Sequence, residues 1–327
     1  MARFAGNKWV FVALLLGELM FWPVAQAQAF PTKPVQLVIP FPPGGATDIV
    51  GRLVGKKLSD RLGQPVVIEN KAGAGTVVGA AFVANAAPDG YTLLISSGST
   101  FTVNPALNNK LPYDPVKSFE PVGGVARVPL ILVAHRDVPV NNLAQLISAV
   151  RAAPDKYVYG SFGNGTTGHF AAEQMWHTLG VKLLHVPYKG SAPAMADLMG
   201  GQIPFTIDTV ASALPQLRAG KIKAIAVTGS QRSSLLPAVA TVAEQGFAGF
   251  SADSWLAVVA PHGLPAAVAA KLQKALAEVM ADPEMATKLT DSGLQSAYVP
   301  AAAVAAQIDA ELPRMRATAA RANIKAE

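Results

Sequence analysis

Short apolar runs alternate with amphipathic segments along almost the whole of this chain. Uninterrupted apolar runs are typical of strands that helices cover on both faces, because neither face of such a strand meets water. We therefore expect an α/β fold with mostly parallel sheets. The expected strands are Val35–Pro40, Val66–Glu69, Tyr91–Ser96, Leu130–Ala134, Lys156–Tyr159, Leu183–Val186, Ile203–Ile207, Ile222–Thr228 and Trp255–Ala260.

The segments between these runs carry helical periodicity and helix end signals. Asp48–Leu62 places its apolar residues on one stripe, and Gly63 follows as a stop signal. Asp282 and Pro283 fit the N-cap and the first position of a further helix. Pro313 interrupts the last helical segment, which leaves the form of the C-terminal region open. Other helices are expected over residues 142–151, 209–219 and 265–280.

The first residues have the pattern of a secretory signal peptide. Arg3 and Lys8 precede the apolar run Trp9–Leu16, and Ala27-Gln28-Ala29 fits a small-residue cleavage site. The alternative is a membrane anchor, but the run is shorter than the ~20 residues that span a bilayer. We expect residues 1–29 to be a cleaved signal peptide and the mature protein to be exported.

The composition fits a protein with large hydrophobic cores. Hydrophobic residues make up 51% of the chain and charged residues 15%, which excludes a disordered chain. There is no cysteine, so thiolate metal sites and cysteine catalysis are excluded. The net charge of +6 is scattered, without a basic run interleaved with aromatic residues. Nucleic acid is therefore not an expected partner.

The chain has no long flexible linker of the kind that separates tandem domains. The expected crossings are instead strand-like, at about Val125–Val133 and Phe250–Val259. We therefore expect the chain to leave a first domain and later return to it. The expected domains are residues 30–127 together with 253–327, and residues 128–252. The cleft between two such domains is the natural place for a ligand.

Two glycine-rich turns stand where an expected strand passes into an expected helix. The first is Pro42-Pro43-Gly44-Gly45-Ala46-Thr47-Asp48, and the second runs from Ser161 to His169. A helix start has unpaired backbone N–H groups and partial positive charge, so it attracts anions. Two such turns that face each other could hold one small anion. The alternative is purely structural, with Thr47 or Asp48 capping a helix.

The second turn resembles a phosphate loop in its spacing from Gly160 to Thr166. It lacks the lysine that such loops require, so a nucleotide is not expected. Its hydroxyl groups, on Ser161, Thr166 and Thr167, suit a carboxylate. Ala72–Gly79 also fails the dinucleotide-binding spacing, and we interpret it as a turn that opens a helix.

His169, Glu173 and His177 recur every four residues and so share one helix face. Metal binding is conceivable there, but no third nearby ligand cluster appears in the sequence, and we predict no metal and no cofactor. His169 would lie in the first helical turn, where its ring could point toward an anion in the cleft. No pair of groups has the spacing of a general acid and base, which argues against an enzyme.

Other residues at expected strand ends are candidates for the wall of the cleft. The hydroxyl-rich segment Ser97–Ser99 ends a strong strand, and Tyr188 follows another. Phe41 is either a cleft wall or part of the core. Asp208 either caps the next helix or faces the cleft, where it would meet an ammonium or hydroxyl group of the ligand.

Several motifs together resemble the Bug-type periplasmic solute receptors of tripartite tricarboxylate transporters. The resemblance covers nearly all of the mature chain. It rests on FPTKP at residues 30–34, PFPPGG at 40–45 with Asp48, PDGYTLL at 88–94, NPAL at 104–107, LPYDP at 111–115, Gly165-Thr166 with His169, and VPYKG at 186–190.

The resemblance implies a two-domain clamshell of the type II periplasmic binding-protein class, joined by two crossing strands. It implies that a carboxylate is bound by Gly44, Gly45 and Ala46 on one side, and by Ser161, Gly165, Thr166 and Thr167 on the other. The full set of predicted ligand-binding residues is Phe41, Pro43, Gly44, Gly45, Ala46, Asp48, Ser97, Gly98, Ser99, Ser161, Gly163, Gly165, Thr166, Thr167, His169, Tyr188 and Asp208.

The expected function is that of a periplasmic, monomeric receptor that delivers a small organic acid to a membrane permease. Family ligands include di- and tricarboxylates, acidic amino acids and aromatic acids, and the sequence does not choose among them. One alternative is a ligand sensor for a signalling partner on the same fold. A periplasmic enzyme is the less favoured alternative.

Overall fold

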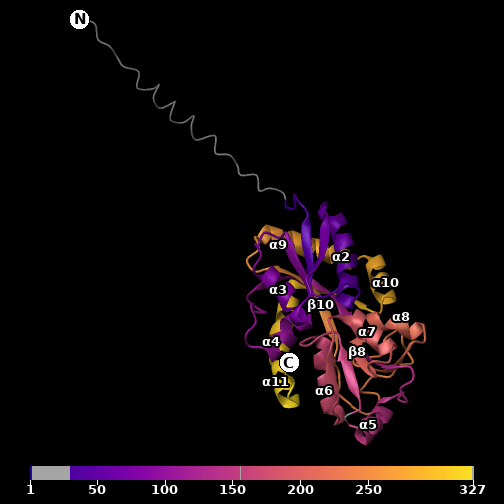
Figure 1. Cartoon of the computed structure of the whole chain (residues 1–327). Helices are drawn as coiled ribbons and strands as arrows, with labels where there is room; N and C mark the ends of the chain where they lie inside the picture. Colours follow the sequence, from indigo (N-terminus) through magenta and orange to yellow (C-terminus); the bar gives the residue numbers. More distant parts are fainter. Residues whose placement is uncertain (2–29, 155, 326–327) are drawn as a thin grey trace.

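The computed structural model describes residue 1, residues 30–154 and residues 156–325. Residues 2–29, nearly all of the predicted signal peptide, lie outside this description. In the described part, no helix is long and apolar enough to cross a bilayer. The elements form two halves, and α11 (Ala301–Ala322) extends from the half that holds α9 (Ala266–Met280) to contact α6 (Thr167–Leu179) of the other (Figure 1).

The first half is built on a six-stranded sheet in the order β11-β4-β10-β3-β1-β2. Helices α2 (Ala46–Leu62) and α9 pack on one face, and α3 (Val77–Ala84) and α11 pack on the other. Helices therefore shield both faces of the inner strands from water, which explains the uninterrupted apolar runs. The strands are β1 (Val35–Ile39), β2 (Val66–Asn70), β3 (Thr92–Ser97), β4 (Phe119–Val128), β10 (Ser254–Pro261) and β11 (Gln295–Pro300).

The second half is built on a five-stranded sheet in the order β7-β6-β8-β5-β9. Helices α5 (Leu143–Ala152) and α6 cover one face, while α7 (Ser191–Met199) and α8 (Val210–Arg218) cover the other. The strands are β5 (Leu130–His135), β6 (Val158–Ser161), β7 (Leu184–Pro187), β8 (Phe205–Thr209) and β9 (Ile222–Val227). The remaining short elements are η2 (Ala74–Thr76), η3 (Ser99–Val103), α4 (Asn104–Leu107) and α10 (Pro283–Asp291).

The expectation of mostly parallel sheets is wrong, because both sheets are mixed. The neighbours of β1 and of β6 run parallel to them, as expected of strands joined over helices. The strands that enter from the other half, β5 and β10, pair antiparallel with both of their neighbours. A strand that arrives directly from another sheet makes no helical crossover, so nothing imposes parallel pairing on it.

The two connections between the halves lie side by side. Pro129 alone separates β4 from β5, and residues 228–253 link β9 to β10. The Thr228 N–H donates to the Leu130 carbonyl over 3.0 Å, and the Ala252 N–H donates to the Thr228 carbonyl over 2.8 Å. The strands of the first sheet come from residues 35–128 and 254–300, and those of the second from residues 130–227. The domain boundaries themselves stay a prediction.

The helix ends are partly as predicted. Gly63 ends α2 in the left-handed conformation, with φ of 69°. Asp282 caps α10, and its side chain accepts the Glu284 N–H. Pro313 does not interrupt the last helix, which continues through it because its buried face packs on the first half. The edge strand β11 was not predicted, since its side chains are only partly buried and form no apolar run.

Candidate functional site

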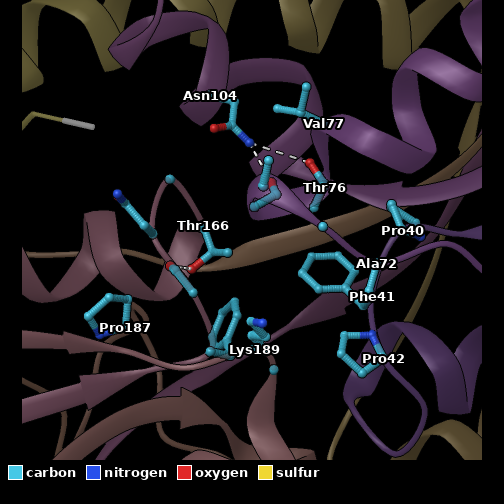
Figure 2. A pocket seen from close by; sticks show the side chains of 18 of the residues that line it. Pro40, Phe41, Pro42, Ala72, Thr76, Val77, Asn104, Thr166, Pro187 and Lys189 are labelled. Carbon is cyan, nitrogen blue, oxygen red and sulfur yellow. Dashed lines mark hydrogen bonds between the residues drawn. The ribbon is translucent and has the colours of Figure 1, made fainter. Parts of the chain in front are cut away.

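A large cavity of about 570 Å³ opens between the two halves, and we call it the outer chamber. Figure 2 shows Phe41 and Pro42 of the first half on one side of it, and Thr166 and Pro187 of the second half on the other. Lys110 and Lys189 are the charged residues among the described residues that line it. The outer chamber is therefore bounded by both halves and has a cationic lining.

A second, much smaller cavity of about 30 Å³ adjoins the outer chamber, and we call it the inner chamber. Phe41, Pro42, Phe162 and Gly190 line both cavities, and the rings of Phe41 and Phe162 meet edge to face with centroids 6.4 Å apart. A water molecule needs ~10–15 Å³ of such volume. The inner chamber therefore has room for about two oxygen-sized groups, as in one carboxylate.

Four helix N-termini converge on the inner chamber. They are the starts of α2 (Gly45 to Thr47), α6 (Thr167), α7 (Gly190 and Ser191) and α8 (Thr209). Each N-terminus carries partial positive charge. The Thr167 and Thr209 amides, at the starts of α6 and α8, already donate to Ser99 Oγ and Asp208 Oδ1. Such an arrangement favours an anion over a neutral or cationic group.

Hydroxyl groups supply the rest of the polar lining of the inner chamber, and no ionisable residue is among its described lining residues. The Ser254 Oγ is buried and has no hydrogen-bond partner in the described structure. A buried polar atom without a partner is costly, so it marks a place where a ligand or water completes the bonding. The hydroxyl-bearing residues are Thr47, Ser97, Thr167, Ser191, Thr209 and Ser254.

In the first glycine-rich turn, Asp48 holds the loop rather than lining a chamber. Its Oδ2 accepts from the Gly44 N–H at 3.0 Å and from Arg52 Nε at 2.9 Å, and its Oδ1 accepts from Asn70 Nδ2 at 2.9 Å. Burial raises the pKa of Asp48, but the hydrogen bonds from Arg52, Asn70 and Gly44 outweigh it and lower that pKa below its ordinary value. Gly45, the N-cap of α2, provides no side-chain cap.

In the second turn, protein groups already bind the backbone amides. Thr166 is the N-cap of α6 and its side chain accepts from the His169 N–H. The Thr167 N–H donates to Ser99 Oγ of the first half over 2.9 Å. The Gly165 N–H lies 3.4 Å from His169 Nδ1. The Thr166 hydroxyl is engaged as well, since its Oγ1 donates to the Gly163 carbonyl over 2.6 Å. Hydrogen bonds within the protein therefore hold most polar groups of this turn.

Two stacked histidine rings lie next to the second turn. The rings of His169 and His185 lie with centroids 4.2 Å apart and an interplanar angle of 10°. Ser161 Oγ is 2.8 Å from His185 Nε2. Burial lowers the pKa of His169 to about 4. Burial, and next to it the neighbouring His169, lowers the pKa of His185 to about 3, so both rings are neutral at pH 7.

The two halves touch each other beside the outer chamber. A Cβ added at Gly75 would lie 2.2 Å from the Asn164 carbonyl oxygen, and one at Gly165 would lie 2.3 Å from Asn104 Oδ1. A Cβ at Gly190 would lie 2.8 Å from Pro42 Cγ. Glycine is needed at these three positions because opposing segments approach closely, and all three have positive φ.

The structure places about half of the predicted site residues on the chamber walls. Asp208, for which we expected either a helix cap or a position facing the cleft, is fully buried and lies outside the described lining of both chambers. Direct contact of these residues with a ligand stays a prediction. The predicted residues that line a chamber are Phe41, Gly45, Ala46, Ser97, Gly163, Gly165, Thr166, Thr167 and Tyr188, and those that do not are Pro43, Gly44, Asp48, Gly98, Ser99, Ser161, His169 and Asp208.

Several lining residues were missed at the level of sequence. Asn104 is 5% exposed, and its Nδ2 donates to the Gly75 carbonyl in the loop that precedes α3 (Figure 2). Ser191, Thr209 and Ser254 come from three separate elements, and isolated hydroxyl residues carry no sequence signal. His185 was not among the predicted site residues, and its ring stacks on that of His169.

The His169, Glu173 and His177 face does not assemble a metal site. The Glu173 side chain instead accepts a hydrogen bond from the Tyr159 hydroxyl. Across the described residues, no group of three or more histidine, cysteine, aspartate or glutamate side chains is arranged to hold a metal ion.

The chain matches the model of the tripartite tricarboxylate transporter family receptor, TctC, over residues 50–323. Among solved structures, it is similar to the periplasmic binding protein BugD, with 36% identity and a TM-score of 0.86 over 90% of this chain and 99% of that one. It is also similar to R. palustris Rpa4515 with adipate, with 35% identity and a TM-score of 0.88 over 90% and 99% of the two chains.

A third similar structure is MatC from Rhodopseudomonas palustris with bound malate, with 34% identity and a TM-score of 0.83 over 88% of this chain and 99% of that one. The fold and the site thus define a solute-binding protein of the periplasmic type. The chain belongs to the TctC receptor family, so the predicted family and fold class are confirmed. The family consists of receptors, which confirms the prediction that this protein is not an enzyme.

Proposed function

We propose that this protein captures a small organic acid between its two halves and presents it to the permease of a tripartite transporter. The observation that carries the proposal is the inner chamber, where four helix N-termini and six hydroxyl residues meet in the volume of one carboxylate. One carboxylate of the ligand occupies the inner chamber. The rest of the ligand extends past Phe41 and Phe162 into the outer chamber.

The identities of ligands in similar proteins support a carboxylate. Adipate is bound to Rpa4515 and malate to MatC, and both are dicarboxylates. In this chain, Lys110 and Lys189 border the outer chamber without an acidic neighbour among the described lining residues. This lining suits a ligand whose far end is also anionic.

The proposal includes export and closure. The N-terminal sequence pattern supports export to the periplasm with removal of residues 1–29. Residues 30–127 with 253–327 and residues 128–252 act as two domains that close over the ligand about the adjacent crossings near Pro129 and Thr228. A ligand that contacts both domains shifts the population toward the closed form, because its contacts differ between the two states.

Ligand-dependent thermal stabilisation tests the proposal. The full mature chain is screened by differential scanning fluorimetry against di- and tricarboxylates, acidic amino acids and aromatic acids. A ligand at ~100 times its Kd stabilises the folded state by about 2.7 kcal/mol. If no carboxylate changes the Tm, the proposed function is wrong.

Gly45→Val tests whether the first turn contacts the ligand. Gly45 has φ of −85°, a conformation that valine adopts, and a Cβ there would lie 3.7 Å from Ser191 Oγ. The fold should therefore tolerate the change, while the added side chain enters the space beside the inner chamber. We expect at least a tenfold loss of affinity, about 1.4 kcal/mol, by isothermal titration calorimetry.

The matched control is Ala267→Val on the exposed surface of α9. It adds a valine far from both chambers and should leave the affinity unchanged. Unchanged affinity in Gly45→Val, with the control also unchanged, would remove the first turn from the site.

A further inference from the structure

Ser191 stands where the two halves meet at the inner chamber. It is the first residue of α7, after Gly190 as N-cap. Its Oγ faces Gly45 of the first half, and it lines the inner chamber together with Thr209. A ligand carboxylate in that chamber would thus place its neighbouring carbon close to the Ser191 hydroxyl.

The hydrogen of the Ser191 hydroxyl is already engaged. Ser191 Oγ donates to Asp208 Oδ1 over 2.7 Å, and the Thr209 N–H donates to the same oxygen over 2.7 Å. A serine hydroxyl has one hydrogen and two lone pairs. As long as Asp208 accepts that hydrogen, Ser191 offers the chamber only lone pairs.

Asp208 is well placed to act as a permanent acceptor. It is fully buried, and its Oδ2 has no hydrogen-bond partner in the described structure. Burial raises the pKa of Asp208 to about 6, against hydrogen bonds from Ser191, Thr209 and Ser212 that lower it. Because Oδ1 accepts from both Ser191 and Thr209, this oxygen carries no proton, and it acts as an acceptor for Ser191 whether or not the carboxyl is ionised.

We propose that Asp208, acting through Ser191, selects organic acids that carry an O–H or N–H donor on the carbon next to the bound carboxylate. Ser191 binds the ligand and Asp208 is a positioning residue, which fixes the direction of the Ser191 hydroxyl. This inference rests on the proposed function. The charge of the two chambers does not impose this requirement for a donor on the ligand. It arises because Ser191 offers the ligand an acceptor, whereas the rest of the inner chamber offers donors.

Three acids with one carbon skeleton test the inference. Succinate, malate and aspartate differ only in bearing hydrogen, hydroxyl or ammonium on that carbon. Their affinities are measured by isothermal titration calorimetry at pH 7.5. We expect malate and aspartate to bind about tenfold more tightly than succinate, since a buried donor and acceptor pair each other only in the substituted acids. Comparing the affinities of malate and aspartate shows whether the site prefers a hydroxyl or an ammonium group on that carbon.

Variants assign the preference to the two residues. Ser191→Ala should reduce the ratio between malate and succinate to about one, and Ser191→Thr, which keeps the hydroxyl, should restore it. Asp208→Ala should also lower the ratio, because it removes the acceptor that holds the hydrogen of the Ser191 hydroxyl and frees that hydrogen to turn toward the ligand. Ser292→Ala, at the end of α10, is the control and should leave the ratio unchanged.

The outcomes separate the inference from the proposed function. If the wild type binds the three acids equally, or the ratio survives in Ser191→Ala, the inference is overturned and the receptor function stands. A merely structural role of Ser191 would weaken all three acids by the same factor, which also overturns it. If only longer acids bind, adipate, 2-hydroxyadipate and 2-aminoadipate replace the set with the same expected ratios. If no carboxylate binds, the proposed function itself fails.

Discussion

The two glycine-rich turns look alike in sequence but differ in how far acceptors within the protein already bind their backbone N–H groups. The first turn begins α2 at Gly45, which provides no side-chain cap, so the start of this helix depends on the inner chamber for acceptors. The second turn begins α6 under the Thr166 cap, with the Thr167 amide bound by Ser99. We therefore expect the two motifs to serve one site differently, the first by binding the anion and the second by forming a wall whose hydrogen bonds are already made.

The largest expected effect comes from placing alanine in each turn. Gly165 has φ of 70°, and a Cβ there would lie 2.3 Å from Asn104 Oδ1. Gly165→Ala should lower the free energy of unfolding by about 1–2 kcal/mol or more and weaken binding at least tenfold. Gly45→Ala should leave stability within about 0.5 kcal/mol. Denaturant unfolding and calorimetry measure both, and equal stability losses would contradict the comparison.

A smaller effect concerns the histidines below the second turn. The pKa values of His169 and His185 are lowered to about 4 and about 3, so below pH 6.5 the unfolded chain binds more protons than the native state. Stability should therefore fall as the pH decreases from 6.5 toward 4, by on the order of 2 kcal/mol per histidine. The raised pKa of Asp208 acts in the opposite direction, since its stabilising proton is lost as the pH rises through about 6.

Denaturant unfolding of the ligand-free protein between pH 4 and pH 8 measures this dependence. His185→Gln removes one titrating group and should flatten the decrease. A profile that is as steep in His185→Gln as in the wild type would show that the pair is not its cause.

The smallest expected effect is that of the hydrogen bond between the halves. Ser99→Ala leaves the Thr167 amide without the hydroxyl that accepts its hydrogen bond. An unpaired buried amide costs ~1–3 kcal/mol. We expect a severalfold loss of carboxylate affinity by calorimetry, less than in Gly165→Ala. An increase in affinity would mean that the ligand itself accepts the hydrogen bond of the Thr167 amide. Both turns would then bind the ligand through their backbone N–H groups.

Much of the fold could be predicted because local patterns determine it. Apolar runs such as Val35–Pro40 are covered on both faces, and Asp282-Pro283 starts a helix as its chemistry demands. The mixed pairing of the sheets could not be predicted from these patterns, since the direction in which β5 and β10 enter depends on the path of the whole chain. The prediction for Pro313 was wrong because the tertiary packing of α11 outweighs the local cost of a proline inside a helix.

The candidate site likewise contains residues that could be predicted from the sequence and residues that could not. Gly45 and Thr167 belong to turns with recognisable chemistry, and they line the inner chamber. Ser191 and Ser254 lie far apart in the chain and resemble any other surface serine in sequence. Only the folded arrangement brings them together, so a reading of local motifs could not find them.

The convergence of helix starts on the inner chamber also concerns the empty protein. The N-terminus of α2 belongs to one half, and those of α6, α7 and α8 belong to the other. Each behaves like about half a positive charge. Asp48 in the first turn of α2 and Asp208, which accepts the Thr209 N–H at α8, already lie beside two of these starts, whereas α6 and α7 have no acidic residue in their first turn. In the proposed receptor, a carboxylate would supply the negative charge that α6 and α7 lack, so a partner that binds only the closed form would distinguish a loaded receptor from an empty one.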